Sequence, residues 1–366
     1  MGPFAECFSD LQDPRGPNAL HDLTELLFIA LLATLCGATS CCDMALFART
    51  KRELLGSVLD LNFGVPSHDT FSRVFRLLDP KGFEHAFQRF MKAFSDHMKL
   101  GRVTGVVAID GKALRCAYER GRSHMPVMMV TAWGAQTRMA LANAQAQDGG
   151  EAAAALLLIE LLQLKGCVVT ADALHCRRDT AQAIRDRKGD YVLAVKDNQP
   201  KLLKAAKAAI AAARGKKTAR GAPCREFSHG RKEQRTAIVA SAKAVAHELE
   251  FPGLAAFAMI RSKRATDKPV ERYYLLSRHY RPTRLLNIVR QHWGIENRLH
   301  WTLDVLLDED LARTRKDNAP AILAILRRLA LNIARAHPDT KTSMRGKLKR
   351  AGWDESFMFD MLEHMR

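Results

Sequence analysis

Three acidic residues occupy positions from which their carboxylates could share one pocket. Asp110 ends the run VTGVVAID, Asp172 ends the run CVVTAD, and Glu296 lies in the string HWGIEN. Ionised carboxylates rarely adjoin such apolar runs unless they are paired or bind a metal ion. Carboxylates are hard ligands for Mg²⁺ or Mn²⁺, and two such ions can activate an attacking oxygen and stabilise a leaving oxygen at phosphorus. The three acids therefore predict metal-dependent phosphoryl transfer.

Each acid, taken alone, also has a plain structural explanation. Asp110 precedes Gly111, as an acid in a turn at the end of a strand would. Glu296 suits the first turn of a helix, where its charge would stabilise the helix dipole. The catalytic interpretation therefore depends on all three acids and on the sequence around them.

The elements that must position these acids can be predicted from periodicity. The middle of the chain is predicted to form three strands, at 103–110, 126–133 and 138–146, then a helix at 151–164, a strand at 167–172, a helix at 176–188 and a strand at 191–196. This order predicts an α/β fold with a mixed sheet. Acids at the ends of neighbouring strands would then meet at one edge of that sheet.

The flanking regions have different patterns. Leucines at helical spacing and a capping Ser67 predict that residues 1–100 form an all-helical domain. We predict a catalytic domain over residues 101–340, interrupted by a β-rich insertion at about 197–280. Residues 341–366 are basic, and we predict that they form a C-terminal tail.

Charge divides the chain unequally. The net charge is +18, yet residues 1–100 carry only 10 basic residues against 12 acidic ones. The excess of positive charge after residue 100 predicts a polyanionic partner. The basic runs 201–225 and 341–350 favour contact with phosphates, whereas the nearly neutral N-terminal region could dimerise or brace the catalytic core instead.

Several classes of protein are disfavoured. The eight cysteines form no CxxC pair, which argues against a zinc site or a disulfide framework. The apolar segment from Leu23 to Gly37 is too short to span a bilayer, so we expect no membrane association. The N-terminus lacks the basic and apolar regions of a signal peptide, so we expect a cytoplasmic protein.

The sequence resembles the bacterial insertion-sequence DDE transposases of the ISAs type, also called H-repeat-associated proteins. The matching strings span nearly the whole chain: DPRGPNALHDLTELLFIALLATLCGA, VPSHDTFSRVFRLLDP, AIDGKALR, VVTADAL, DYVLAVKDNQP, HGRKEQR, HWGIENRLHWTLDVLLDED and ARTRKDNAPAILAILRRLALNIAR. The resemblance implies a helical N-terminal domain and a ribonuclease-H-like catalytic domain with a β-rich insertion. By position, Asp110, Asp172 and Glu296 become the catalytic and metal-binding triad, with two Mg²⁺ or Mn²⁺ ions.

The implied activity is cleavage at the ends of an insertion sequence and strand transfer into target DNA. The implied partners are terminal inverted repeats, target DNA and further copies of the chain, because two element ends must be joined. Two other hypotheses remain at this point. One is a degenerate copy that binds DNA without cutting it, and the other is a ribonuclease-H-like nuclease.

The sequence departs from its relatives around the glutamate and after the third strand. Many relatives carry an arginine and a lysine where this chain has His292 and Leu303. Contacts with DNA ends are therefore expected from His292, Asn297, Arg298 and His300. The string DGGE, residues 148–151, also lacks the lysine of a Lys-Ser-Asn-Glu string, which is the best support for a degenerate copy.

Three other side chains have two interpretations each. Lys112 either contacts a phosphate or caps the turn after Asp110. Trp293 and Trp301 lie eight residues apart on one predicted helix face, which favours packing in the core over stacking on DNA bases. His300 either approaches the scissile phosphate or is an ordinary packed or exposed histidine.

Overall fold

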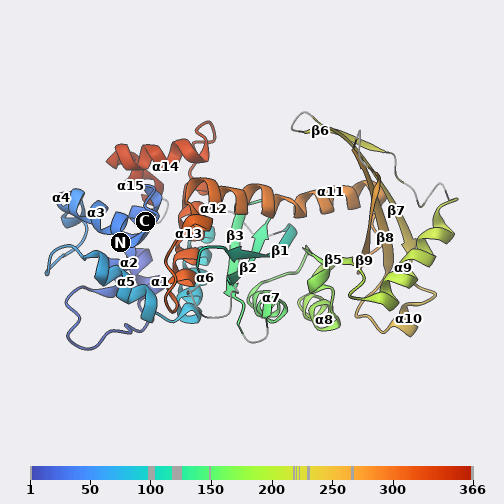
Figure 1. Cartoon of the computed structure of the whole chain (residues 1–366), viewed down its shortest axis with the longest axis horizontal. Coiled ribbons are helices and arrows are strands. Elements are labelled where there is room, and N and C mark those ends of the chain that lie inside the picture. The colour runs from blue at the N-terminus through green and yellow to red at the C-terminus, as the bar shows by residue number, and fades with distance from the viewer. Residues whose placement is uncertain are drawn as a thin grey trace.

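The computed structural model describes residues 2–97, 104–117, 126–147, 150–216, 219, 221, 223–228, 231–264 and 268–363. Residue 103 of the first predicted strand, residues 148–149 of the DGGE string, and residues 217–218, 220 and 222 of the first basic run lie outside these ranges. Figure 1 shows an elongated molecule with helices of both chain ends on one side and a β-rich region on the other.

One mixed sheet runs through the molecule, in the strand order β3-β2-β1-β4-β5-β9-β8-β7-β6. Its strands are β1 Gly105–Leu114, β2 Val127–Gly134, β3 Met139–Gln145, β4 Cys167–Ala171, β5 Asp190–Val195, β6 Cys224–Ser228, β7 Arg231–Ser241, β8 Ala256–Arg264 and β9 Val270–Leu276. β1, β4 and β5 are parallel, whereas β2 is antiparallel to β1. The predicted mixed α/β sheet is thus confirmed.

The β-rich segment is continuous with this sheet. β9 pairs antiparallel with β5, and β8, β7 and β6 follow it outward. α9 (Pro200–Ala213) covers part of this extension, as Figure 1 shows. The insertion predicted at about 197–280 therefore lengthens the catalytic sheet, because its last strand finds a free edge on β5.

Alternate residues of β1 face different helices, as the pleat of a strand requires. Val107 and Ile109 pack with α7 (Gly150–Leu161) and α8 (Arg178–Asp186). Val106 and Ala108 lie on the opposite face, where Val106 shares a core with α11 (Pro282–His292). Ala108 belongs to a core that also contains residues of the helical region.

The helical region combines the two ends of the chain. It contains α1 Gly2–Phe8, α2 Leu23–Leu35, α3 Cys41–Thr50, α4 Arg52–Gly56, α5 His68–Leu77, α6 Pro80–His97, α13 Ala319–Ala336, α14 Met344–Trp353 and α15 Glu355–Glu363. One apolar core includes residues of these helices together with Trp133 of β2. Ser67 caps α5 by accepting a hydrogen bond from the Thr70 amide, as predicted.

The C-terminal residues do not form the predicted tail. α14 and α15 pack on α2 and α13 and bury Leu348, Phe357 and Met358. Lys51 of the helical region also forms an ion pair with Glu355. The basic residues of this segment misled the prediction, because its apolar residues recur at helical spacing between them. The divisions proposed at residues 100 and 340 stay predictions.

A long helical rod lies along one face of the sheet (Figure 1). It consists of α11, a π-helical segment at Ile295–His300, and α12 (Trp301–Leu306). Glu296 lies in the first turn of the π-helical segment, early in a late helical stretch as the sequence predicted. Gly294, directly before this segment, keeps α-helical backbone angles, so the direction of the rod continues from α11.

Candidate active site

Asp110 and Asp172 lie at matching positions on adjacent parallel strands. Ile109 of β1 pairs with Ala171 of β4, and each aspartate is the next residue along its strand direction. Parallel neighbours are about 4.8 Å apart, so the two carboxylates begin from adjoining backbone positions. The sequence predicted that Asp110 ends its strand, but β1 continues to Leu114.

Asp172 stands where β4 gives way to a short 3-10 helix, Ala173–His175. Its Oδ1 atom accepts a hydrogen bond from the Leu174 amide at 2.9 Å, so the carboxylate caps this turn. Glu296 comes from the π-helical segment, on the rod that crosses the same face of the sheet as Ala108. π-Helical turns inside helices are frequent at functional sites, since the extra residue redirects nearby side chains.

The charges of the three acids interact at Asp110. Burial, and after it the charges of Glu296, Asp172 and Glu151, together raise the pKa of Asp110 to about 7. Burial also raises the pKa of Glu296, which the charge of Arg272 opposes. Carboxylates that repel one another in this way are stabilised by a bound cation.

The donor set fits a divalent cation, because its carboxylates are hard oxygen ligands. In the described ranges, no group of three or more His, Cys, Asp or Glu side chains is already arranged to hold a metal ion. Mutual repulsion opposes the close approach of these carboxylates until positive charge is present.

Two histidines of the rod face the sheet instead of the solvent. The Nδ1 atom of His292 lies 3.0 Å from Oγ1 of Thr170, and burial lowers the His292 pKa to about 4. The Nδ1 atom of His300 lies 3.8 Å from Oδ2 of Asp110, and burial lowers the His300 pKa to about 3. Both rings are neutral at neutral pH, so neither provides a positive charge for a phosphate.

Lys112 lies on β1 but is turned away from solvent. Only 7% of its side chain is exposed, and its ammonium group lies 2.7 Å from Asp304, 2.5 Å from Asp310 and 3.8 Å from Glu309. These acids occupy α12 and the 3-10 turn Glu309–Leu311. Lys112 thus ties the sheet to the segment that follows the rod, which neither interpretation from the sequence anticipated.

Asn297 and Arg298 are exposed on the rod, as contacts for DNA would need to be. Arg335 of α13 donates hydrogen bonds to the backbone carbonyls of Arg298 and Arg138, which lies in the turn between β2 and β3. Burial and the charges of Arg138 and Arg298 lower the Arg335 pKa to about 10. We call Arg138, Arg290, Arg298 and Arg335 the arginine cluster, because burial and the charges of Arg138 and Arg290 also lower the Arg298 pKa.

The sequence favoured packing in the core for both tryptophans, and the structure does not place both of them there. Trp301 is 57% exposed. Trp293 is half-buried, and the guanidinium of Arg272 lies 5.3 Å from the centroid of its ring. The eight-residue spacing did not place them on one face, because the π-helical segment between them changes the helical period.

The site contains two further residues to which the sequence assigned no role. Glu151, in the first turn of α7, lies 3.2 Å through Oε1 from the Nε2 atom of His175. The same Nε2 atom lies 4.0 Å from Oδ1 of Asp172. Glu151 belongs to the DGGE string and His175 to the ALHCRRD string, so the only signal in the sequence was their place in these motifs.

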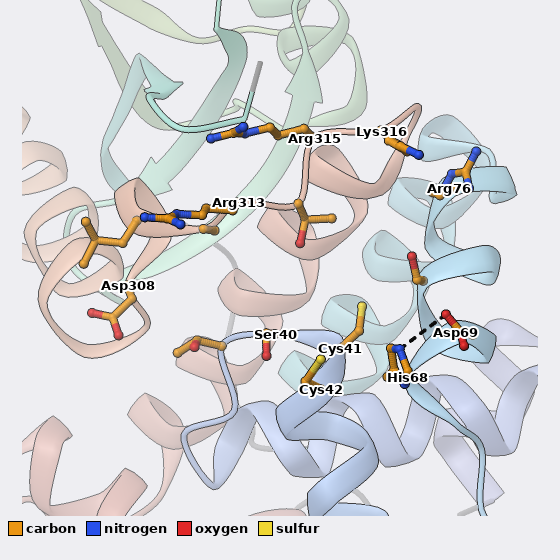
Figure 2. A pocket seen from close by; sticks show the side chains of 15 residues that line it. Ser40, Cys41, Cys42, His68, Asp69, Arg76, Asp308, Arg313, Arg315 and Lys316 are labelled. Carbon is orange, nitrogen blue, oxygen red and sulfur yellow. Dashed lines mark ion pairs between the residues drawn. The ribbon is translucent and has the colours of Figure 1, made fainter. Parts of the chain in front are cut away.

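A second basic surface lies where the helical region meets the segment after the rod. A cavity of about 640 Å³ is lined there by Arg76 of α5 and by Arg313, Arg315 and Lys316 (Figure 2). We call it the junction cavity. Its walls are held by an ion pair of 2.7 Å between Arg76 and Asp317.

None of the eight cysteines forms a disulfide in the part of the chain that the structure describes. Burial raises the pKa of Cys36, Cys41 and Cys176 to about 12 in each case, so these thiols are poor nucleophiles. Within the described residues, no helix is both long enough and apolar enough to cross a membrane.

Comparisons with known proteins agree with this geometry. Residues 101–333 match the family described as "Transposase DDE domain", and residues 5–91 match the family described as "DDE_Tnp_1-associated". YncI of Escherichia coli O157:H7, a protein named as a transposase, is 31% identical over 93% of this chain and 89% of its own length. YhhI of E. coli K12, named as an H repeat-associated transposase, is 28% identical over 93% of this chain and 92% of its own length.

A solved structure also resembles the chain, although weakly. It is a piggyBac transposase synaptic complex with hairpin DNA, with a TM-score of 0.44 and 15% sequence identity, covering 99% of this chain and 77% of that one. The family assignment rests on the domain matches and the E. coli relatives. This chain belongs to the DDE transposases, enzymes that move DNA, and it carries their ribonuclease-H-like catalytic fold behind a helical associated region.

Proposed function

We propose that Asp110, Asp172 and Glu296 form the catalytic triad and together hold two Mg²⁺ or Mn²⁺ ions. The observation that carries this proposal is that Asp110 and Asp172 directly follow the paired residues Ile109 and Ala171, and burial and the charges of Glu296 and Asp172 also raise the pKa of Asp110. Bound divalent cations supply Lewis acidity that stabilises the charged oxygens at phosphorus. Asp110 lies on β1, Asp172 directly follows the adjacent strand β4, and Glu296 belongs to the π-helical segment of the rod.

The DNA substrates in this proposal are the terminal inverted repeats of an insertion sequence and a target duplex. Water would cleave at the 3′ end of the element, and the freed 3′-hydroxyl would attack the target phosphodiester. At least two copies of the chain would act together, because two ends must be joined. We place the protein in the cytoplasm, whose reducing environment suits cysteines that form no disulfide in the described part of the chain.

The arginine cluster and the junction cavity are the surfaces that we propose to contact DNA phosphates. The arginine cluster gathers like charges, an arrangement that a phosphate stabilises. The junction cavity adds Arg313 and Lys316 beside the helical region. Contacts of this kind provide affinity and register without reading sequence. His292, His300 and Lys112 are not part of these surfaces.

A strand-cleavage assay tests the proposal. Purified protein is mixed with a labelled duplex that carries the ends of the element encoding it, in Mg²⁺ or Mn²⁺. Asp110→Asn, Asp172→Asn and Glu296→Gln should each abolish nicking while leaving the Kd for the duplex within about twofold. Binding without nicking by the wild-type protein in either metal would instead identify a DNA-binding relic. Nicking without strand transfer would identify a nuclease.

A further inference from the structure

We propose that Glu151 is a fourth carboxylate of the active site and helps to bind the divalent cations, with His175 as the residue that positions it. The inference rests on the proposed metal-dependent function. It extends the site to α7, on the opposite face of the sheet from the rod. The geometry around Gly111 is its main support.

Gly111 leaves the space that Glu151 occupies. A Cβ atom built on Gly111 would lie 2.4 Å from Oε1 and 2.5 Å from Cδ of Glu151, far inside the contact distance. Gly111 follows Asp110 on β1, so successive residues of the strand face opposite sides. Asp110 therefore meets the rod, whereas the missing side chain of the next residue admits the carboxylate of Glu151 beside it.

His175 contacts this carboxylate. Its side chain is fully buried, with Nε2 at 3.2 Å from Glu151 and at 4.0 Å from Asp172. Its Nδ1 atom is buried without a hydrogen-bond partner among the described residues. A buried polar ring is costly unless it makes such contacts. The imidazole is thus wedged between two carboxylates and fixes the orientation of Glu151.

Glu151 contacts β1 as well as His175, at the residue that directly follows Asp110. Only 18% of its side chain is exposed. A packing role alone would not require a negative charge at this position, because α7 is otherwise rich in alanine and leucine. Positive charge between these acids would relieve their repulsion.

The first experiment measures Mn²⁺ binding by electron paramagnetic resonance, with the protein bound to the element-end duplex, beside strand cleavage. Glu151→Gln should weaken Mn²⁺ binding by about tenfold or more, as removal of residues around metal sites commonly does. Cleavage should be slow at low Mn²⁺ and partly restored at high Mn²⁺. The matched control is Glu160→Gln, which removes an exposed carboxylate from the same helix and should change neither quantity.

A second variant tests the same idea without removing the charge. Gly111→Ala should displace the Glu151 carboxylate and weaken Mn²⁺ binding in the wild-type background. It should add little in the Glu151→Gln background, because the displaced group is then already altered. His175→Asn should behave in the same way, with its effect on Mn²⁺ affinity confined to proteins that retain Glu151.

The outcomes separate this inference from the proposed function. If the wild-type protein cuts DNA and Glu151→Gln matches Glu160→Gln in both Mn²⁺ affinity and cleavage, the fourth carboxylate is refuted while the triad stands. Additive effects of Gly111→Ala and Glu151→Gln would refute it too. If the wild-type protein neither binds Mn²⁺ nor cuts, and Asp110→Asn changes nothing, the triad itself fails.

Discussion

The ammonium group of Lys112 lies 2.7 Å from the Oδ1 atom of Asp304, across the space between β1 and α12. Asp310 and Glu309 surround the same ammonium group, and the fully buried Glu309 also pairs with Arg328 at 2.8 Å. The basic residue nearest to Asp110 in the sequence is therefore a structural cation. It shares the neutralisation of these acids with Arg328, which pairs with Glu309, and with Arg115, which pairs with Asp310.

Lys112→Met should destabilise the protein and leave DNA binding intact. Removing one partner of a buried ion pair leaves the remaining charges unpaired and lowers the free energy of unfolding by about 3–5 kcal/mol. Urea unfolding would measure this loss, and filter binding at several salt concentrations would measure affinity for DNA. A variant with unchanged stability, but with a salt dependence reduced by about one phosphate contact, would show that Lys112 binds DNA instead.

Arg298→Gln and Arg138→Gln should each weaken DNA binding with little effect on stability. Each removes one charge from the arginine cluster, so the slope of log K against log salt should fall by about one. Relief of repulsion within the cluster should offset any packing that is lost. Arg52→Gln, on the exposed surface of α4, is the matched control and should leave the slope unchanged. Equal slopes for all four proteins would contradict the assignment.

Gly294→Ala should disturb the rod where it crosses the sheet. A Cβ atom on Gly294 would lie 2.6 Å from Cη2 of Trp133, a side chain that is 1% exposed. Overpacking of this kind costs about 1–3 kcal/mol, and it should also move Glu296 and slow cleavage. Unfolding and cleavage rates would be compared with those of Gly352→Ala, in α14.

The control site has room for the added methyl group. The nearest atom to a Cβ on Gly352 is 3.4 Å away, so alanine there should be neutral or stabilising, as helix propensity predicts. If Gly294→Ala cuts DNA at the wild-type rate with undiminished stability, the rod tolerates more movement against Trp133 than the contact distance allows.

The stability of the protein should fall as the pH rises from about 4.5 to 8 through Glu84. Burial raises the pKa of this carboxyl to about 8 from its usual 4.5, although hydrogen bonds from Asn143 and Gln88 lower it. The folded state therefore keeps a proton that the unfolded state loses within this window, and stability declines with pH. Above pH 8 the carboxyl is ionised in both states, so its contribution no longer changes.

Glu84→Gln should flatten that decline, because the amide cannot ionise. Its free energy of unfolding at pH 8 should exceed that of the wild-type protein, whereas the two should be similar near pH 4.5. Chemical denaturation at a series of pH values would measure both curves. Glu53→Gln, at an exposed position on α4, should follow the wild-type curve. Parallel curves for Glu84→Gln and the wild-type protein would show that Glu84 is ionised throughout.

Local patterns in the sequence determined which elements form. Apolar runs at 167–172 and 191–196 became strands, and the helical spacing of the first hundred residues became α1 to α6. The strings around Asp110, Asp172 and Glu296 also indicated the family, which the domain matches confirm. These features lie within short stretches of chain, so they can be recognised before any long-range contact is known.

Tertiary structure alone decided which distant residues meet. The sequence placed Glu151 in a motif but did not show that Gly111 makes room for it, 40 positions earlier in the chain. Nor did it show that β9 would join β5, or that Lys112 would face three acids of a later segment. Strand pairing and burial depend on the packing of whole elements, because each surface is removed from water only when its partner arrives. Local periodicity in the sequence does not indicate which element that partner is.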